Sequence, residues 1–366
     1  MEEIRHVVVF RDPDRYAGWP ANYGIWAWGE EIVSGFTLGF PNLDGGFHSR
    51  DKNRPLITMQ CRSYDGGNSW ISDVAPLLAP GGGSISAEEH TNETYGPVAG
   101  GIHPPVTHPG DIDFGSPDFA MLLGRTGLLT GAESWFYISN DKCVTWQGPF
   151  TLPMFDQLGI AARTDYFVNP DSGANRLSLF LTATKPDGGE GRVFCAQSEA
   201  GGKEFRFVSW LREYPEGFDI MPSSVKLPSG TILTAVRCRT KGGDKDYIDL
   251  FESQDNGLSW SLIANPVPDT GIGGNPPVLL MLADGRLCLV FGYRNPPFGI
   301  YAVLSLDSGL SWSDPVPLRT GGGNHDIGYP RAVQRSDGAV VIVYYFNDRA
   351  KSERYIAATI WHPRDL

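Results

Sequence analysis

One pattern of eight residues occurs four times along this chain of 366 residues. Each copy begins with serine, has aspartate two positions later and ends with tryptophan, and the copies span residues 63–70, 139–146, 253–260 and 305–312. Asp and Gly tolerate positive φ at a hairpin tip, and Ser and Asp side chains can cap the free N–H groups of a tight turn. Because a turn repeated in such detail marks a repeated structural unit, the chain is predicted to be an array of similar units.

The segments between these turns have the composition of β-strands. Residues 177–182, 231–236, 287–291 and 340–345 are rich in β-branched and aromatic side chains and are bounded by Gly, Asp or Pro. No segment has a convincing amphipathic helical pattern. The order is a strand, a tight turn, two further strands, the eight-residue turn and a last strand, which predicts a four-stranded antiparallel blade.

The number of such units predicts how the array closes. A degenerate fifth copy of the turn spans 198–205, and a sixth unit begins near Gly328 but lacks a fourth strand after residues 354–361. The N-terminal run 4–10 can supply that strand, which closes a ring and removes open sheet edges. We therefore expect an all-β chain, a single six-bladed β-propeller domain over residues 1–366.

One segment departs from the strand pattern. Residues 77–115 are rich in Gly, Pro and His and carry no clear strand signal. A loop of this length in a compact domain is usually functional or mobile, so we expect a long loop insertion there.

Composition excludes several classes of partner. No stretch approaches about 18 consecutive apolar residues, so no membrane span is expected. A formal net charge of −12 disfavours binding to nucleic acid or to an anionic membrane surface. The five cysteines are scattered and no Cys or His pair has metal-ligand spacing, so we expect neither a disulfide framework nor a metal or cofactor. The N-terminus lacks the plan of a signal peptide, which favours the cytoplasm, although an exported protein with its signal removed would look the same.

The four turns and the six blades resemble the sialidase (neuraminidase) superfamily, in which such turns are called Asp boxes or BNR repeats. The resemblance extends over nearly the full length, but the turns themselves indicate fold and not activity. Sialidases hold the carboxylate of the sugar with three arginines and use a tyrosine nucleophile assisted by a glutamate, with an aspartate as acid and base. A neutral phenol suits this role because the sugar carboxylate repels a charged nucleophile.

The resemblance implies roles for four residues of this sequence. Tyr329 opens the sixth blade and matches the nucleophile. Arg237, at the end of the strand 231–236, and Arg294, 11 residues before the turn at Ser305, match two of the carboxylate-binding arginines. Asp51, 12 residues before the first turn, matches the acid/base.

The sequence also departs from the sialidase pattern. Met221 stands where the assisting glutamate is expected, with Asp219 two residues away, and no arginine occupies the first position in residues 16–20. Arg50, or else Arg11 or Arg15, could replace that arginine. Further candidates for the site are His325 and Asp326 as helpers of Tyr329, and Trp19 as a surface that stacks on a sugar ring.

Three functional hypotheses follow. The first is an exo-acting, sialidase-like glycoside hydrolase whose substrate is a glycan with an acidic sugar. The second is a polysaccharide lyase, in which Tyr329 and a histidine move protons beside a uronate whose carboxylate is neutralised by arginine. The third is a non-catalytic propeller that binds glycans, with Met221 marking the lost chemistry.

Overall fold

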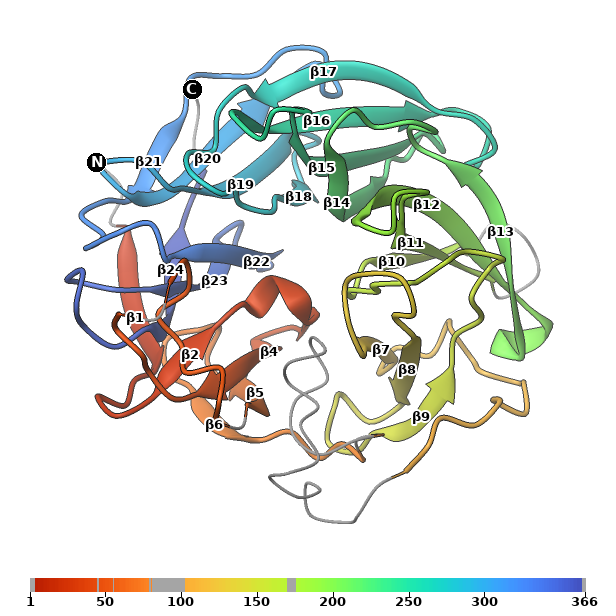
Figure 1. Ribbon diagram of the computed structural model, residues 1–366, viewed down its shortest axis with the longest axis horizontal. Coiled ribbons are helices and arrows are strands. Elements are labelled where there is room, and N and C mark those ends of the chain that lie inside the picture. The colour runs from red at the N-terminus through yellow and green to blue at the C-terminus, as the bar shows by residue number, and fades with distance from the viewer. Residues whose placement is uncertain are drawn as a thin grey trace.

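Six antiparallel sheets stand in a ring around a common axis in the computed structural model (Figure 1). The structure describes residues 4–44, 46–54, 56–78, 80, 103–169 and 176–363. Each sheet forms one blade, with its strands following one another outward from the axis. The prediction of a six-bladed β-propeller is confirmed.

Three consecutive blades have the expected four strands in chain order. The third blade contains β10 (Tyr166–Asn169), β11 (Arg176–Thr184), β12 (Glu190–Glu199) and β13 (Glu204–Trp210), with the short 3-10 helix η5 (Ala200–Gly202) before β13. The fourth contains β14 (Phe218–Lys226), β15 (Ile232–Arg239), β16 (Asp246–Ser253) and β17 (Ser261–Val267). The fifth contains β18 (Val278–Met281), β19 (Leu287–Tyr293), β20 (Gly299–Ser305) and β21 (Val316–Arg319).

The first two blades vary this plan. In the first, β2 (Tyr16–Gly18) and β3 (Ile25–Trp28) both pair with β4 (Glu31–Gly39), the 3-10 helix η1 (Pro20–Asn22) separates them, and β5 (Ile57–Ser63) and β6 (Ile71–Val74) complete the sheet. In the second, the described residues form β7 (Ala120–Arg125), β8 (Ser134–Ser139) and β9 (Gln147–Thr151). Most of the predicted insertion, residues 79 and 81–102, lies outside the described residues.

The sixth blade closes the ring as predicted. It contains β22 (Gly328–Gln334), β23 (Val340–Phe346) and β24 (Tyr355–Trp361), and the N-terminal strand β1 (Arg5–Phe10) pairs with β24 as its outermost strand. Every residue of β23 and β24 is buried, because the neighbouring blades cover both faces of this sheet. This burial explains why these strands read as continuous apolar runs.

The four eight-residue turns share one set of hydrogen bonds. In each, the serine hydroxyl donates to the aspartate at 2.8–2.9 Å and accepts the N–H four positions after the serine at 2.8–2.9 Å. The aspartate also accepts the N–H four residues beyond itself, at 2.8–2.9 Å. Each turn connects the two outermost strands of a blade, as described, so the repeated sequence corresponds to a repeated place in the fold.

The remaining sequence expectations concern cysteines and helices. All five cysteines are buried and free, which agrees with their prediction as small core residues. In the described part of the chain, no helix is long and apolar enough to cross a membrane.

Candidate functional site

Three innermost segments begin at one end of the axis with the same unusual backbone. Trp19, Met221 and Tyr329 have φ values of 60°, 52° and 51°, and each precedes a proline. Such a conformation costs about 1–3 kcal/mol for a residue other than glycine and persists where the surrounding structure holds it. At Met221 and Tyr329 it coincides with a register shift in the ladder to the next strand, and a bulge of this kind redirects a side chain. All three side chains join one buried cluster.

Arg237 connects two of these residues. Its Nη1 donates to the phenol oxygen of Tyr329 at 3.2 Å and lies 3.8 Å from the sulfur of Met221, while Nη2 donates to the carbonyl of Gly273. Arg237 is only 7% exposed, and its Nε has no hydrogen-bond partner among the residues that the structure describes. No carboxylate among the described residues forms an ion pair with Arg237. Burial accordingly lowers its pKa, because an unpaired guanidinium is costly to desolvate.

The phenol of Tyr329 lies in a field of positive charge. Burial alone would raise its pKa, but the charges of Arg237, Arg294 and Arg163 outweigh burial and hold the pKa below its ordinary value. The side chain remains 9% exposed. A tyrosine in this setting ionises more readily than a free one and can act as a nucleophile or base.

Arg294 lies over the ring of Tyr329 and is itself enclosed by protein groups. It is fully buried, and its guanidinium carbon lies 5.3 Å from the centre of the Tyr329 ring. Its guanidinium donates to the carbonyls of Gly274 (2.8 Å) and Ile327 (3.1 and 3.2 Å) and to the hydroxyl of Tyr345 (2.8 Å). The expected role, direct binding of a ligand carboxylate, does not fit this geometry, because protein groups occupy nearly all of its donors.

Asp326 is a buried connector between blades. Its carboxylate accepts hydrogen bonds from the backbone N–H of Ser49 (2.9 Å), Arg354 Nε (3.0 Å) and the Tyr345 hydroxyl (2.9 Å), and it pairs with His48 (2.8 Å). Burial alone would raise its pKa, but His48, Arg354 and these hydrogen bonds hold the pKa far below the usual range. The geometry makes Asp326 an orienting group and not the helper of Tyr329 that we expected.

His325 also differs from expectation. Its Nε2 lies 2.9 Å from the carbonyl oxygen of Phe47, and the two rings are 4.5 Å apart. It forms no hydrogen bond with Tyr329, so the contacts of His325 hold the loop of residues 40–54 against the sixth blade.

His48 is the residue of this site that sequence reasoning missed. Its Nδ1 lies 2.8 Å from Asp326, and an ionised carboxylate can only accept, so Nδ1 carries the proton and Nε2 carries the lone pair. Burial, with Arg294 and Arg50, lowers the pKa of His48, although Asp326 opposes this shift. The imidazole is therefore neutral at pH 7 and its side chain is 27% exposed, and within the described part of the chain no hydrogen bond occupies Nε2. A histidine oriented by a carboxylate in this way can serve as a general base.

Arg50 and Trp19 lie beside His48. The guanidinium carbon of Arg50 is 5.6 Å from the centre of the Trp19 ring. Trp19 is 5% exposed and packs between Tyr16 and His48, with ring centres 5.2 Å from each, which leaves it little surface on which a sugar could stack. Asp51 accepts the backbone N–H of Asn53 at 2.9 Å in a local turn, and no contact joins it to Tyr329.

The other candidates for the missing arginine lie elsewhere. Arg11 pairs with Asp348 and Glu353, and Arg15 donates to the carbonyl of Gly39. Asp219 is buried and pairs with Arg212 at 3.2 Å, and burial raises its pKa to about 6. Arg163, which the sequence did not single out, pairs with Glu190 at 2.5 Å and adds to the positive charge around Tyr329.

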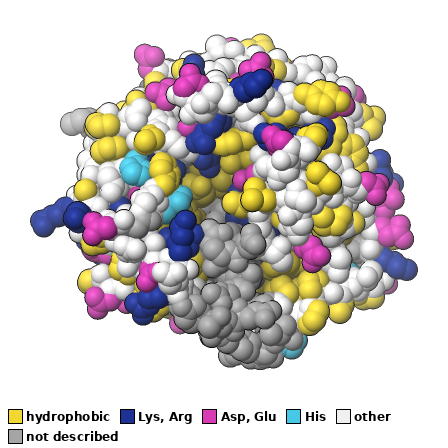
Figure 2. Space-filling view, in the orientation of Figure 1, with side chains coloured by type: hydrophobic (Ala, Val, Ile, Leu, Met, Phe, Trp, Pro, Cys, Tyr) yellow, Lys and Arg dark blue, Asp and Glu magenta, His cyan; other side chains and the backbone are white. Residues whose placement is uncertain are grey.

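We call the group of Tyr329, Arg237, Arg294, Met221 and His48 the axial site. The loop of residues 40–54 covers part of it, since Phe47 contacts Arg294 at 5.4 Å and a side chain at Gly273 would collide with the Phe47 ring. In the space-filling view, basic and histidine side chains lie beside the central hollow (Figure 2). Among the described residues, no group of three or more His, Cys, Asp or Glu is placed to hold a metal ion.

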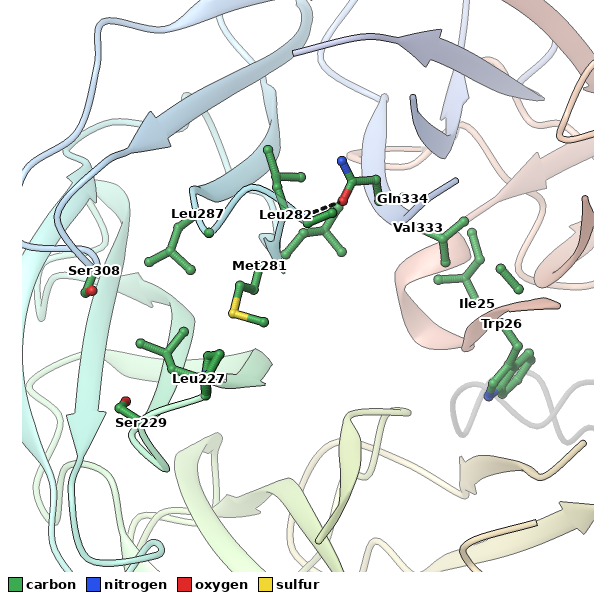
Figure 3. A pocket seen from close by; sticks show the side chains of 15 residues that line it. Ile25, Trp26, Leu227, Ser229, Met281, Leu282, Leu287, Ser308, Val333 and Gln334 are labelled. Carbon is green, nitrogen blue, oxygen red and sulfur yellow. Dashed lines mark hydrogen bonds between the residues drawn. The ribbon is translucent and has the colours of Figure 1, made fainter. Parts of the chain in front are cut away.

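The opposite end of the axis is chemically different. A cavity of about 730 Å³ lies where the innermost strands end, and Leu227, Met281, Leu282 and Val333 are among the side chains around it (Figure 3). None of the described residues that line this cavity is charged. The axial site, in contrast, contains groups able to do acid–base or nucleophilic chemistry.

Comparison with known proteins supports the fold. No family model matches the sequence, and a search of curated proteins finds no match. A protein of unknown function from Dyadobacter fermentans is similar over 99% of both chains, with a TM-score of 0.69 and 20% identity. The fold is that of the sialidase-like propellers.

Glycoside hydrolases of two kinds share this fold. An α-L-arabinanase of Penicillium chrysogenum has a TM-score of 0.59 and 14% identity over 99% of both chains. The NanB sialidase of Streptococcus pneumoniae has a TM-score of 0.60 and 12% identity over 97% of this chain and 70% of its own. At such identities the likeness establishes the architecture and leaves the activity to be argued from the axial site.

Proposed function

We propose that the protein is a glycoside hydrolase that acts on a glycan bearing an acidic sugar. The observation that carries the proposal is the hydrogen bond from Arg237 to Tyr329 at 3.2 Å, made by a buried guanidinium that has no carboxylate partner and an unused Nε. A sugar carboxylate would supply the missing charge and accept from Nε, and guanidinium groups suit carboxylates. The likeness to sialidases and arabinanases supports the architecture that this proposal needs.

In the proposed reaction, Tyr329 attacks the anomeric carbon and the glycosidic oxygen leaves with a proton. The resulting sugar–tyrosine bond is then hydrolysed by water. Met221 cannot take the phenolic proton, so Tyr329 would attack as the phenolate after losing that proton to solvent, and the nearby arginines that lower its pKa favour this form. Asp51, on the loop that also carries His48 and Arg50, is the proposed proton donor.

One observation favours a second candidate, a polysaccharide lyase. His48 presents a neutral Nε2 held by Asp326, which is the form required to remove the proton beside a uronate carboxylate. The C–H electrons would form the new double bond as the C–O bond breaks, and the Tyr329 phenol would protonate the leaving oxygen. Arg237 would neutralise the carboxylate that acidifies the proton.

A panel of acidic oligosaccharides separates these reactions. New reducing ends without near-ultraviolet absorbance support the hydrolase, whereas an unsaturated, absorbing product supports the lyase. Both reactions predict that Tyr329→Phe lowers turnover by about 10²–10⁴-fold, the usual contribution of a proton-transfer or nucleophilic group. Binding without any cleavage by the unaltered protein would overturn both and favour a binding propeller.

A further inference from the structure

A groove between the fourth and fifth blades has the features of a sugar-binding surface. It encloses about 440 Å³ and is lined by Phe291, Tyr293, Tyr301 and three prolines, with Asp269 and Asp314 at its edge. Tyr301 stacks on Phe291, with ring centres 6.1 Å apart and planes inclined by 25°, and meets Tyr293 edge-on at 5.9 Å. These contacts fix the rings, so that little conformational entropy is lost when a ligand packs on them.

The polar groups of this groove have spare hydrogen-bonding capacity. Both tyrosines are half-buried, and no hydrogen bond within the described residues uses either phenol hydroxyl. Asp314 is exposed and its carboxylate forms no ion pair with the described residues. Aromatic faces beside carboxylates and hydroxyls suit a ring that presents C–H groups on one face and hydroxyls at its edge.

The groove is linked to the axial site by a second cavity. This cavity, of about 510 Å³, shares Asp269 with the groove and is also lined by Asn295 and Gly273, and by the charged residues Asp244, Lys245 and Asp246. The carbonyl of Gly273 accepts a hydrogen bond from Arg237. Arg294 and Tyr293 are consecutive in the chain, with Arg294 in the axial site and Tyr293 in the groove. The second cavity, with Asp269 at the groove and Gly273 beside Arg237, therefore lies between the groove and the axial site.

The groove and the axial site differ in charge, and this difference indicates which sugar unit each would bind. The groove has two carboxylates and no Lys or Arg among its lining residues, so it disfavours an acidic sugar. The unpaired cation lies at the other end, at Arg237. The two ends are thus complementary to a chain with one acidic unit and neutral units beyond it.

We propose that the groove of Tyr293 and Tyr301 binds neutral sugar units of the same glycan whose acidic unit occupies the axial site. The inference rests on the proposed function only for the acidic sugar unit in the axial site. It makes the substrate an oligosaccharide or polysaccharide and not a single terminal sugar on any carrier.

Affinity electrophoresis tests the groove without requiring turnover. Gels would contain arabinan, arabinogalactan, xylan or galactomannan as neutral probes, and Tyr329→Phe would be the parent protein. We expect at least one polymer to retard the parent, and Tyr301→Ala and Asp314→Asn to weaken its binding, Tyr301→Ala by about ten-fold, the scale of one lost aromatic contact. Tyr214→Ala, which removes an exposed tyrosine on a different blade, is the matched control and should bind as the parent does.

The outcomes distinguish this inference from the proposed function. Retardation that Tyr301→Ala and Asp314→Asn both weaken supports the groove even if no acidic glycan is ever cleaved. Asp314→Asn alters an exposed side chain, so it keeps the test valid if Tyr301→Ala fails to fold. Unchanged binding in both variants, no retardation by any of the four polymers, or binding of a polyproline peptide in preference to them would overturn the inference.

Discussion

Arg237 donates a hydrogen bond to the phenol oxygen of Tyr329 over 3.2 Å, although the two residues are 92 positions apart and belong to the fourth and sixth blades. The propeller brings them together because the innermost strand β22 of the sixth blade begins, and the second strand β15 of the fourth blade ends, at the same end of the axis. Positive charge at this point has two consequences. It favours the phenolate of Tyr329, and it leaves a buried cation that forms no ion pair with a carboxylate of the described residues.

Removing the charge of Arg237 should raise the pKa of Tyr329. Arg237→Met takes away the first of the charges that lower this pKa, so ionisation moves to higher pH. The ionisation of Tyr329 is measured as a difference in tyrosinate absorbance between two proteins. One is Arg237→Met, and the other is Arg237→Met combined with Tyr329→Phe. Arg206→Met, on the outer strand β13, removes the same charge away from the axis and should leave the titration unchanged. An equal titration in Arg237→Met and the unaltered protein would contradict the account.

Placing a carboxylate at Met221 should also raise the pKa of Tyr329, in this case by opposing the charge of Arg237 instead of removing it. The sulfur of Met221 lies 3.8 Å from Arg237 Nη1, so the new carboxylate of Met221→Glu would pair with the guanidinium and oppose its charge. The pKa of Tyr329 should rise in Met221→Glu compared with Met221→Gln, which has similar size and no charge. If the two variants titrate alike, Met221 does not occupy the position inferred for the missing glutamate.

Asp326→Asn should destabilise the fold more than it alters the chemistry. The change leaves Arg354 buried without its carboxylate, and breaking a buried pair in this way costs about 3–5 kcal/mol. The folded-state pKa of Asp326 lies below the unfolded value, so its stabilisation is complete above about pH 4 and is lost as the pH falls further. Thermal unfolding at pH 7 and pH 3 measures this. The difference in stability between the two proteins should shrink at pH 3, and a constant difference would refute the assigned role.

His48→Ala separates the two candidate reactions. The hydrolase does not need a base at this position, so turnover by His48→Ala should remain within about ten-fold of that of the unaltered protein. Any further loss of activity should appear as a higher KM. The lyase needs the proton acceptor, and turnover should fall by about 10²–10⁴-fold. In the lyase the acidic limb of the pH–rate profile would follow His48, whose pKa lies below the ordinary value, and this limb would be absent from the variant.

The fold could be predicted from the sequence because its strongest signals are local. The serine and aspartate of each turn bond within the same eight residues, and the strands on either side are marked by β-branched runs. Closure by residues 4–10 followed from counting strands, and β1 lies where that count requires.

The site could be predicted only where position along a blade determines it. Tyr329 and Arg237 stand at strand ends, and the structure brings them together. His48 and Arg163 were missed because long connections place them, and no local pattern marks a histidine whose partner is 278 positions away. Arg294 and Asp326 were given ligand-facing roles because sequence does not reveal that Tyr345, Ile327 and Ser49 already occupy their polar atoms.

Peptide mass spectrometry of the protein, quenched with acid during turnover of an acidic oligosaccharide, tests the central claim most directly. The hydrolase account predicts a peptide containing Tyr329 that carries the mass of one glycosyl unit, and no such peptide from Tyr329→Phe. A sugar attached to any other residue, or full turnover by Tyr329→Phe, would contradict it.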